Sequence, residues 1–425
     1  MTSERRFEQE LPGLLDDLYM GPMPAYRDHV LHHTARIRQR PAWSFPERWL
    51  PMVDIARQPI LAPRFPWRSI SLALLAIALL LAAAAVFIGS QPRLPAPFGV
   101  ARNGLIAYDA RGDIYVGDPV TGESTAIVTG PETDVNPRWS RDGTALAFER
   151  KAEGDVSAGL LFVVRHDGSD LIQLTPEPLP FIETYAFSPD GTQLLITASP
   201  AAVPRILMAA TDGSAIRQLD VPRPARSASW RPDGSEILFL DSPEATGIFA
   251  VSPAGGTVRT IVESTANRYR SDPQWSPDGS LISYIEWGDA EAMTAETHII
   301  GAAGTGDRIL PMPPDADWQA AWFWSNDGTR LLAIRGYSGG MDQTRAVAVP
   351  VDGSGTGIEI EYPSAIQAGC CSAWEWAPDD SWILGTPMSG SGAALDQVLL
   401  DPVAGTSRTP PWTSASQPSW QRLAP

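Results

Sequence analysis

The chain has 425 residues and a formal net charge of −17, from 49 acidic and 32 basic side chains. Its 36 glycines and 40 prolines argue against a helical bundle and for many short strands, while 44% hydrophobic residues exclude a wholly disordered chain. Two cysteines exclude a disulfide scaffold and any zinc site built mainly on cysteine.

Residues 1–68 predict a small helical segment. Hydrophobic residues recur at helical spacing from Phe7 to Leu18 and again from Tyr26 to Ile37, with a Gly-Pro pair between the two runs. Two such helices bury too little surface to form a secure domain. Their apolar faces therefore need each other, the membrane surface or another protein, and we expect residues 1–50 to hold any protein partner.

Residues 69–89 contain no charged side chain and predict a single transmembrane helix. At about 1.5 Å per residue this run spans about 31 Å, the thickness of a bilayer hydrocarbon core. Four arginines lie shortly before the run and two shortly after it, so the positive-inside rule places the N-terminus in the cytoplasm. The sequence thus predicts a single-pass protein of a bacterial cell membrane, with a stalk at 90–99 and an extracytoplasmic domain at 100–425.

One phrase recurs through residues 100–425: an aromatic residue followed by a turn such as Ser-Pro-Asp-Gly. Its aromatic residues, at intervals of 43 to 52 residues, are Trp139, Phe187, Trp230, Trp275, Trp324, Trp376 and Trp420. This period is typical of four-stranded propeller blades, and the turn residues are those that follow a short strand. Because the aromatic residues hold a fixed place in each repeat, we expect them to pack between blades and not to form a ligand cage.

Counting the repeats predicts an all-β, seven-bladed propeller that is closed by the C-terminal strand. The first group of three strands begins at Leu105, before any phrase, whereas no strands follow the last phrase at Trp420. The economical solution is that residues 418–421 supply the inner strand of the blade begun at Leu105. This pairing would remove two exposed sheet edges.

The phrase Trp-Ser-Pro-Asp-Gly, with a strand reading Asp-Ile-Tyr-Val at 113–116, resembles the TolB-type, WD-like propeller repeats of bacterial envelope proteins. The resemblance covers roughly residues 100–423 and implies the propeller fold. The layout of a short helical module, one span and an external domain is similar to that of single-pass anti-sigma-type regulators. That similarity implies a sensor that signals to a cytoplasmic partner.

Recognisable catalytic motifs are scarce in the external domain. Residues 336–340 match the nucleophile-elbow pattern around Ser338, but they fall between two propeller strands and no histidine follows them. His166 and His298 have no metal-ligating neighbour in the sequence. We therefore expect a protein that is not an enzyme and that carries no metal or cofactor. Its acidic external domain should also repel nucleic acid.

Aromatic and arginine side chains outside the phrase supply the candidate ligand-binding residues. They fall in segments of variable length, and these residue types dominate binding hot spots. The candidates are Arg268, Tyr269, Arg270, Trp287, Trp318 and Tyr337. We expect the propeller to bind a protein, a peptide or an envelope polymer. The alternatives are a propeller-based hydrolase or lyase that uses loop carboxylates such as Asp289 and Glu291, and a purely structural envelope scaffold.

Cys370 and Cys371 are adjacent in the sequence. Neighbouring Cα atoms lie about 3.8 Å apart, below the usual disulfide range of about 4.4–6.8 Å, so a bond between them would be strained and easily reduced. An oxidising exterior permits a vicinal disulfide. Two free thiols packed near the final blade are the alternative.

Overall fold

The computed structural model describes Ser71, residues 74–77 and residues 98–424, with gaps in the last range. These gaps are 153, 200–202, 243–245, 289–293, 338–343, 362–372, 387–396 and 413–416. The chain forms two compact units, Met1–Ser90 and Gln91–Pro425. Within the described residues, none of the helical segments has the length and apolar character needed to span a bilayer. Most of the predicted span at 69–89, the predicted helices before it and both cysteines fall outside the described residues, so these predictions stay untested.

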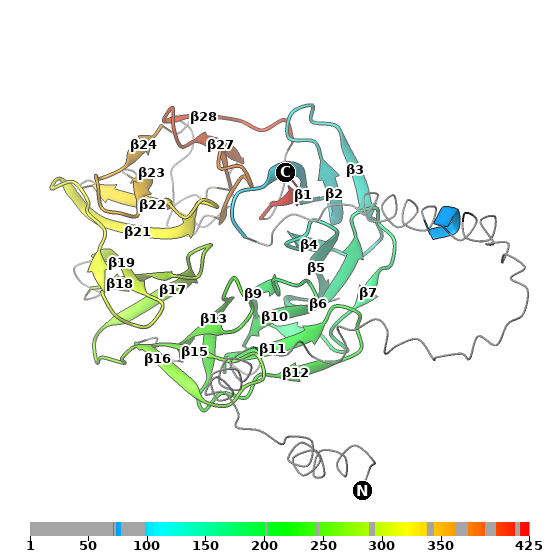
Figure 1. The fold of residues 1–425 in the computed structure, drawn as a ribbon, viewed down its shortest axis with the longest axis horizontal. Coiled ribbons are helices and arrows are strands. Elements are labelled where there is room, and N and C mark those ends of the chain that lie inside the picture. The colour runs from blue at the N-terminus through cyan, green and yellow to red at the C-terminus, as the bar shows by residue number, and fades with distance from the viewer. Residues whose placement is uncertain are drawn as a thin grey trace, which may run out of the picture. The chain divides into compact units, whose positions relative to one another are not determined.

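Seven antiparallel sheets, each built on four consecutive positions, form a ring in the unit Gln91–Pro425 (Figure 1). This arrangement confirms the predicted all-β, seven-bladed propeller. Blade 1 consists of β29 (Ser419–Leu423), β1 (Arg102–Ala110), β2 (Asp113–Gly117) and β3 (Ser124–Val128). Blade 2 consists of β4 (Asp134–Trp139), β5 (Ala145–Ala152), β6 (Asp155–Arg165) and β7 (Ile172–Gln173), with β8 (Leu179–Pro180) also paired to β6.

The remaining blades follow the chain in order, each from its inner to its outer strand except where noted. Blade 3 contains β9 (Ile182–Phe187), β10 (Gln193–Ala198), β11 (Arg205–Ala210) and β12 (Ile216–Gln218). Blade 4 contains β13 (Ala225–Trp230), β14 (Ile237–Asp241), β15 (Ile248–Val251) and β16 (Val258–Val262). Blade 5 contains β17 (Tyr269–Trp275), β18 (Leu281–Trp287), β19 (Ala295–Gly301) and β20 (Arg308–Ile309). Blade 6 contains β21 (Ala316–Trp324), β22 (Arg330–Tyr337), β23 (Thr344–Pro350) and β24 (Ile358–Ile360), and blade 7 contains β25 (Ala373–Trp376), β26 (Ile383–Thr386), β27 (Val398–Asp401) and β28 (Thr406–Arg408).

The repeated phrase forms the turn between the first two strands of a blade. In blade 6, Ser325 Oγ donates a hydrogen bond to Asp327 Oδ1 at 2.6 Å and accepts one from the backbone N–H of Arg330 at 3.0 Å. Asp327 Oδ1 in turn accepts from the backbone N–H of Thr329 at 2.9 Å, and Gly328 takes a φ of 71°. Serine and aspartate therefore satisfy the turn's own backbone, while glycine supplies the left-handed conformation.

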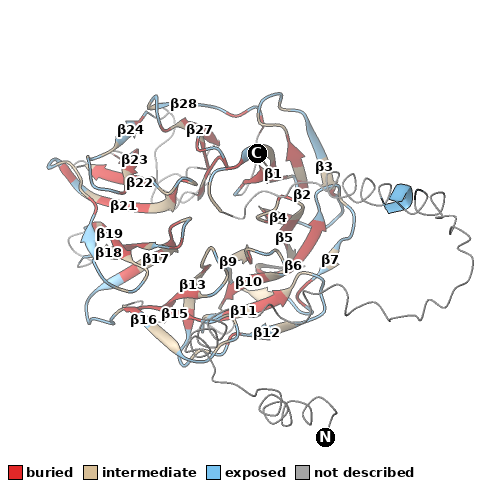
Figure 2. Ribbon diagram, viewed as in Figure 1, coloured by how far each residue is buried: buried red, intermediate tan, exposed pale blue. Residues whose placement is uncertain are grey.

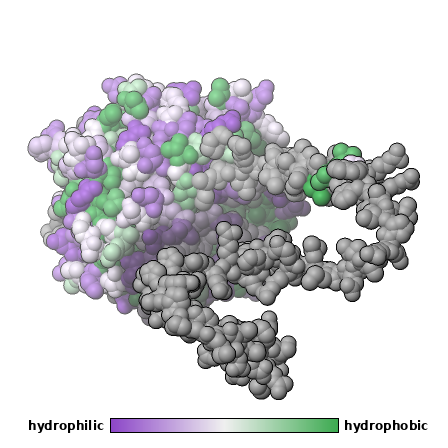
Figure 3. All heavy atoms as spheres, viewed as in Figure 1, coloured by the Kyte–Doolittle hydropathy of each residue, from purple (hydrophilic) through white to green (hydrophobic). Residues whose placement is uncertain are grey.

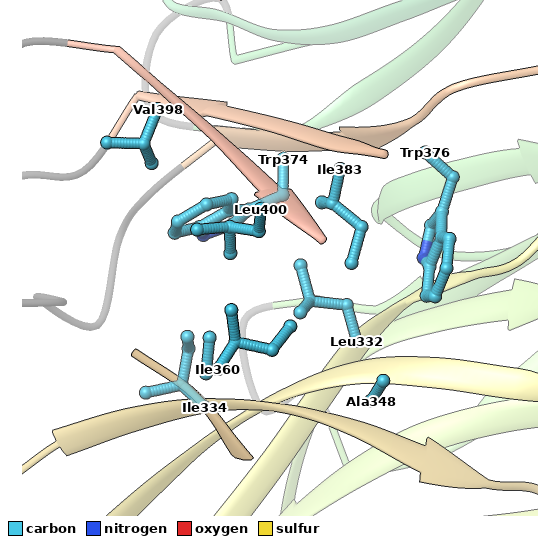
Figure 4. Packing of buried hydrophobic residues seen from close by; sticks show 10 residues of the cluster. Leu332, Ile334, Ala348, Ile360, Trp374, Trp376, Ile383, Val398 and Leu400 are labelled. Atoms are coloured by element: carbon cyan, nitrogen blue, oxygen red, sulfur yellow. The ribbon is translucent and has the colours of Figure 1, made fainter. Parts of the chain in front are cut away.

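The core of the propeller is divided among the interfaces between neighbouring blades, where Figure 2 shows buried residues concentrated on the strands. Each interface holds the phrase aromatic of one blade against the sheet of the preceding one. Between blades 6 and 7, for example, Trp374 and Trp376 contact Leu332 and Ile334 (Figure 4). All seven phrase aromatics are at most 8% exposed. The prediction that they are core residues is confirmed.

The C-terminal strand closes the ring as predicted, and Figure 1 shows β29 beside β1. Ile106 of β1 is in register with Trp420 of β29 in an antiparallel ladder. Gln421 adds two side-chain hydrogen bonds: Oε1 accepts from the Leu105 N–H at 3.1 Å, and Nε2 donates to the Gly143 carbonyl at 2.7 Å. On the face seen in Figure 3, hydrophilic residues surround separate smaller groups of hydrophobic ones.

Candidate functional site in the central channel

The inner strands of the seven blades enclose a cavity of about 590 Å³. A simple sequence rule describes much of its wall, because the residue directly before every phrase aromatic lines the cavity. These residues are Arg138, Ala186, Ser229, Gln274, Phe323, Glu375 and Ser419. Alternation along a strand explains the rule: the aromatic turns toward the blade interface, so its neighbour turns away from it. The wall is therefore a ring of seven different side chains on one rigid repeated backbone.

Charged groups gather where blades 1, 2 and 7 meet. Glu375 of β25 is half-buried, and its Oε2 accepts a hydrogen bond from the backbone N–H of Trp420 at 3.2 Å. Burial raises the pKa of Glu375 above its usual value, against the opposing effect of the charges on Arg138 and Arg141. A carboxyl with a raised pKa beside cationic groups in a cavity is a recognised mark of a functional site.

Three guanidinium groups surround this carboxyl. Burial, followed by the charge of Arg141, lowers the pKa of Arg422 to about 10. Arg422 is held in place, because it donates to Asn326 Oδ1 at 2.7 Å and to the carbonyl of Gly99. Burial also lowers the pKa of Arg141, whose guanidinium lies over the Phe98 ring at 4.3 Å. Such shifts show that these charges sit in a poorly solvated place, where they act strongly on any bound group.

Three inner strands carry an irregularity at the same place. Asn136, Ser227 and Asp272 each lie three residues before a phrase tryptophan and have φ values of 58°, 51° and 51°. Register shifts in β4, β13 and β17 mark β-bulges at these points. A non-glycine residue in the left-handed region costs roughly 1–2 kcal/mol, and bulges often re-aim side chains next to binding sites. The fold therefore tolerates local strain along the wall of the cavity.

The bulge residues make polar contacts across neighbouring blades. Asp272 Oδ2 accepts a hydrogen bond from Trp322 Nε1 of blade 6 at 3.0 Å. The Tyr185 hydroxyl donates to the Asn136 carbonyl, and burial raises the pKa of Tyr185 above its usual value. Tyr185, Asn136, Asp272 and Trp322 all line the cavity. The wall of the cavity is thus tied together by hydrogen bonds between blades.

The candidate residues predicted from sequence lie outside this cavity, in blades 5 and 6. They occupy strands or strand ends instead of variable loops, since Tyr269 and Arg270 are in β17 and Trp287 ends β18. Arg270 is only 5% exposed, and its Nη2 lies 3.1 Å from Glu286 Oε2. Arg268 pairs with the same carboxylate at 2.6 Å. These arginines therefore serve the sheet, and a role in ligand binding stays a prediction.

Trp287, Trp318 and Tyr337 also have partners within the sheets. Trp287 Nε1 donates to Ser271 Oγ at 2.9 Å, and the Trp318 ring packs against apolar residues of blades 5 to 7. The hydroxyl of Tyr337 donates to Glu359 Oε1. Tyr269 remains 43% exposed. Cys370, Cys371, Asp289 and Glu291 fall outside the described residues.

Metal-ligating side chains are dispersed in the described part of the chain, where no group of three or more histidine, cysteine, aspartate or glutamate residues could hold an ion. His298 instead has a structural environment. Its ring stacks on Tyr284 with centroids 4.8 Å apart, and its Nδ1 lies 3.0 Å from Asp307 Oδ2.

Two relatives identified by sequence comparison carry peptidase names. The chain is 28% identical over 174 residues to the "Uncharacterized peptidase YuxL" of Bacillus subtilis, and this match covers 40% of the chain and 24% of the relative. It is 38% identical over 73 residues to "Dipeptidyl-peptidase 5" of Porphyromonas endodontalis, covering 17% of the chain and 10% of the relative. The chain thus matches only about a quarter and a tenth of these relatives' lengths. No family model matches the chain.

Comparison with solved structures identifies the same fold. An oligogalacturonate lyase in complex with manganese aligns with a TM-score of 0.54 at 16% identity, covering 73% of this chain and 85% of that one. A prolyl endopeptidase aligns with a TM-score of 0.54 at 12% identity, covering 75% and 50%. A TolB structure from Acinetobacter baumannii aligns with a TM-score of 0.43 at 15% identity, covering 75% and 66%.

These comparisons overturn one prediction. The absence of a familiar catalytic motif led to the expectation that the chain is not an enzyme, and this is contradicted by relatives named as peptidases and by enzymes among the structural neighbours. The inference failed because motif searches look for residues at fixed spacing along the sequence. In a propeller, groups from different blades meet in the central channel, and their spacing in the sequence follows no short pattern. The findings favour the alternative that we considered, a propeller-based hydrolase or lyase.

Proposed function

We propose that the chain takes part in the hydrolysis of peptides and holds the peptide in its central cavity. The relatives named as peptidases support this proposal, because their similarity to the chain extends over 174 and 73 residues. The cavity itself supports it too. At about 590 Å³ it has the size of a small-ligand site, and its wall combines aromatic surfaces with polar side chains such as Ser229 and Gln274. Such side chains can pair with the N–H and C=O groups of a peptide.

Glu375 is the candidate acid–base group within the chain. Hydrolysis of a peptide bond requires a proton to be taken from water and another to be given to the leaving amine. A carboxyl performs both tasks best when its pKa is raised toward neutrality, which is the direction that burial imposes on Glu375. Its hydrogen bond from the Trp420 N–H, at 3.2 Å, fixes Oε2 and leaves the other oxygen for substrate or water.

The test is a turnover assay on the full-length protein in mild detergent. The substrates are a mixed library of short peptides and, for comparison, an oligogalacturonate. We expect peptide cleavage that falls at least about a hundredfold in Glu375→Gln, as is typical of the loss of a general acid–base group. The matched control is Glu361→Gln, which alters an exposed carboxylate just after the outermost strand of blade 6 and should leave turnover unchanged. Cleavage of oligogalacturonate alone would replace the hydrolase proposal with the lyase alternative, and the absence of any peptide turnover would refute the proposal.

The location of the protein stays part of the proposal. A span at 69–89 would hold the propeller outside the cell, where peptides and envelope polymers are available. Signalling to a cytoplasmic partner through residues 1–50 has no support in the comparisons.

A further inference from the structure

Two arginine side chains in the central cavity lack a counter-charge of their own. Arg138 of β4 and Arg141, two residues after this strand, both line the cavity. Neither guanidinium makes a hydrogen bond or an ion pair with a described residue; the only close contact of this kind is the stacking of Arg141 on Phe98 at 4.3 Å. Arg422, the third cation of the cluster, is already hydrogen-bonded to Asn326 and Gly99.

The acidic residues of the cavity do not neutralise this pair. Glu149 forms an ion pair with Lys151 at 2.7 Å, and Asp272 accepts a hydrogen bond from Trp322 at 3.0 Å. Glu183 accepts a hydrogen bond from Ser199 Oγ at 3.0 Å. Glu375 alone acts on both Arg138 and Arg141, and it does so through space, without an ion pair. The cluster therefore keeps an excess of positive charge, although the whole chain carries a net charge of −17.

We infer that Arg138 and Arg141 form a subsite for the terminal carboxylate of a peptide held in the cavity, an inference that rests on the proposed peptidase function. A guanidinium group binds a carboxylate through two parallel hydrogen bonds, and this match is strongest where water is scarce. Phe98 holds the Arg141 plane in place, so little side-chain freedom is lost on binding. Because neither guanidinium has to give up a hydrogen bond to the protein, binding the ligand breaks no internal contact.

The test compares trialanine with its C-terminal amide on the full-length protein. Binding is measured by equilibrium dialysis at low ionic strength, with the intact peptide quantified by mass spectrometry, so it is read without turnover. We expect the acid to bind about tenfold or more tightly than the amide, the factor typical of hydrogen bonds to a charged group. This preference runs against the net charge of the protein, which by itself favours the more cationic amide.

Three variants locate the effect. Arg138→Gln and Arg141→Gln should each remove most of the preference for the acid, whereas Arg165→Gln, which changes an exposed arginine at the end of β6, should keep it. Glu375→Gln should bind the acid more tightly while its turnover falls, since it removes the competing negative charge. Near-ultraviolet circular dichroism establishes that each variant is folded.

The outcomes separate this inference from the proposed function. A preference for the acid that depends on both arginines, without any hydrolysis, would refute the peptidase proposal and support the subsite. Hydrolysis with equal binding of acid and amide would overturn the subsite and leave the function intact. Tighter arginine-dependent binding of a galacturonate dimer or of inorganic phosphate than of trialanine would overturn the assignment to a peptide carboxylate.

Discussion

The indole N–H of Trp324 in blade 6 donates a hydrogen bond to Ser283 Oγ in blade 5 at 2.8 Å. Equivalent tryptophans elsewhere face apolar residues at this place, and the buried Nε1 atoms of Trp139, Trp230 and Trp275 have no hydrogen-bond partner among the described residues. The interface between blades 5 and 6 thus has a polar contact that these other interfaces lack.

Substituting Ser283 by alanine should destabilise the propeller by about 1–3 kcal/mol, because it leaves the Trp324 N–H buried without an acceptor. Urea denaturation measures this cost. The control is a double-mutant cycle with Trp324→Phe, which has no N–H to satisfy, so the cost of Ser283→Ala should largely disappear in that background. An equal cost in both backgrounds would show that the serine acts by packing alone.

Removing the closing strand should destabilise the domain severely. A chain that ends at Ser414 loses the β29–β1 ladder and the burial of Trp420, which is 3% exposed. Trp420→Ala alone should cost about 3–5 kcal/mol. Thermal melting of the full-length protein, the shortened chain and a chain ending at Leu423 makes the comparison, and the last should melt like the full-length protein because it keeps β29.

The turn carboxylates should make stability depend on pH in the acid range. Burial tends to raise the pKa of Asp327, but hydrogen bonds from Ser325 and Thr329 outweigh it and hold the pKa below its usual value. A lowered pKa in the folded state means that the stabilisation is complete above the unfolded-state pKa and is lost as the pH falls through the folded-state value. Asp327→Asn should therefore lower the urea midpoint at pH 7 and change it much less below pH 3. A difference that grows on acidification would contradict this assignment.

The left-handed conformation at Ser227 should govern which residues this position accepts. Asparagine tolerates positive φ, whereas a β-branched residue does not. With a φ of 51°, Ser227→Asn should be neutral or slightly stabilising, and Ser227→Val should cost about 1–2 kcal/mol or more. Chemical denaturation of the two variants tests the order, and a valine variant as stable as the asparagine one would argue against the bulge.

The predicted membrane topology has a direct test. In a cysteine-free background, an impermeant thiol reagent added to intact cells should label a cysteine placed at Ser124 in β3 and miss one placed at Thr2. Labelling at Thr2 would reverse the predicted orientation.

The fold was predictable because its signals repeat. The phrase ending each inner strand contains its own turn chemistry, and a single count from Leu105 to Trp420 was enough to identify the closing strand. The N-terminal helices and the span lie largely outside the described residues, so those predictions remain open.

The site was harder to predict, since its members come together only through the ring. Glu375 and Arg138 are 237 positions apart in the sequence, and each looks ordinary beside its own tryptophan. The position before each phrase aromatic was the available signal. The bulges at Asn136 and Asp272 left no such mark, because asparagine and aspartate are also common in ordinary turns. The six residues favoured from sequence were selected for side-chain type, and that criterion could not reveal that Arg270 is buried against Glu286.

The joining of β29 to β1 also sets an order for biosynthesis. Leu105 and Gln421 are hydrogen-bonded although 316 residues separate them, so the first blade waits for the last residues to be translated. Blades 2 to 7 draw on consecutive strands and are able to assemble while the chain is still emerging from the ribosome or the translocation channel. Until then β1 has an unpaired edge, which is a site for wrong pairing with another nascent chain. The cell therefore has a specific interval, between the synthesis of Arg102 and that of Leu423, in which a chaperone covering β1 would prevent aggregation.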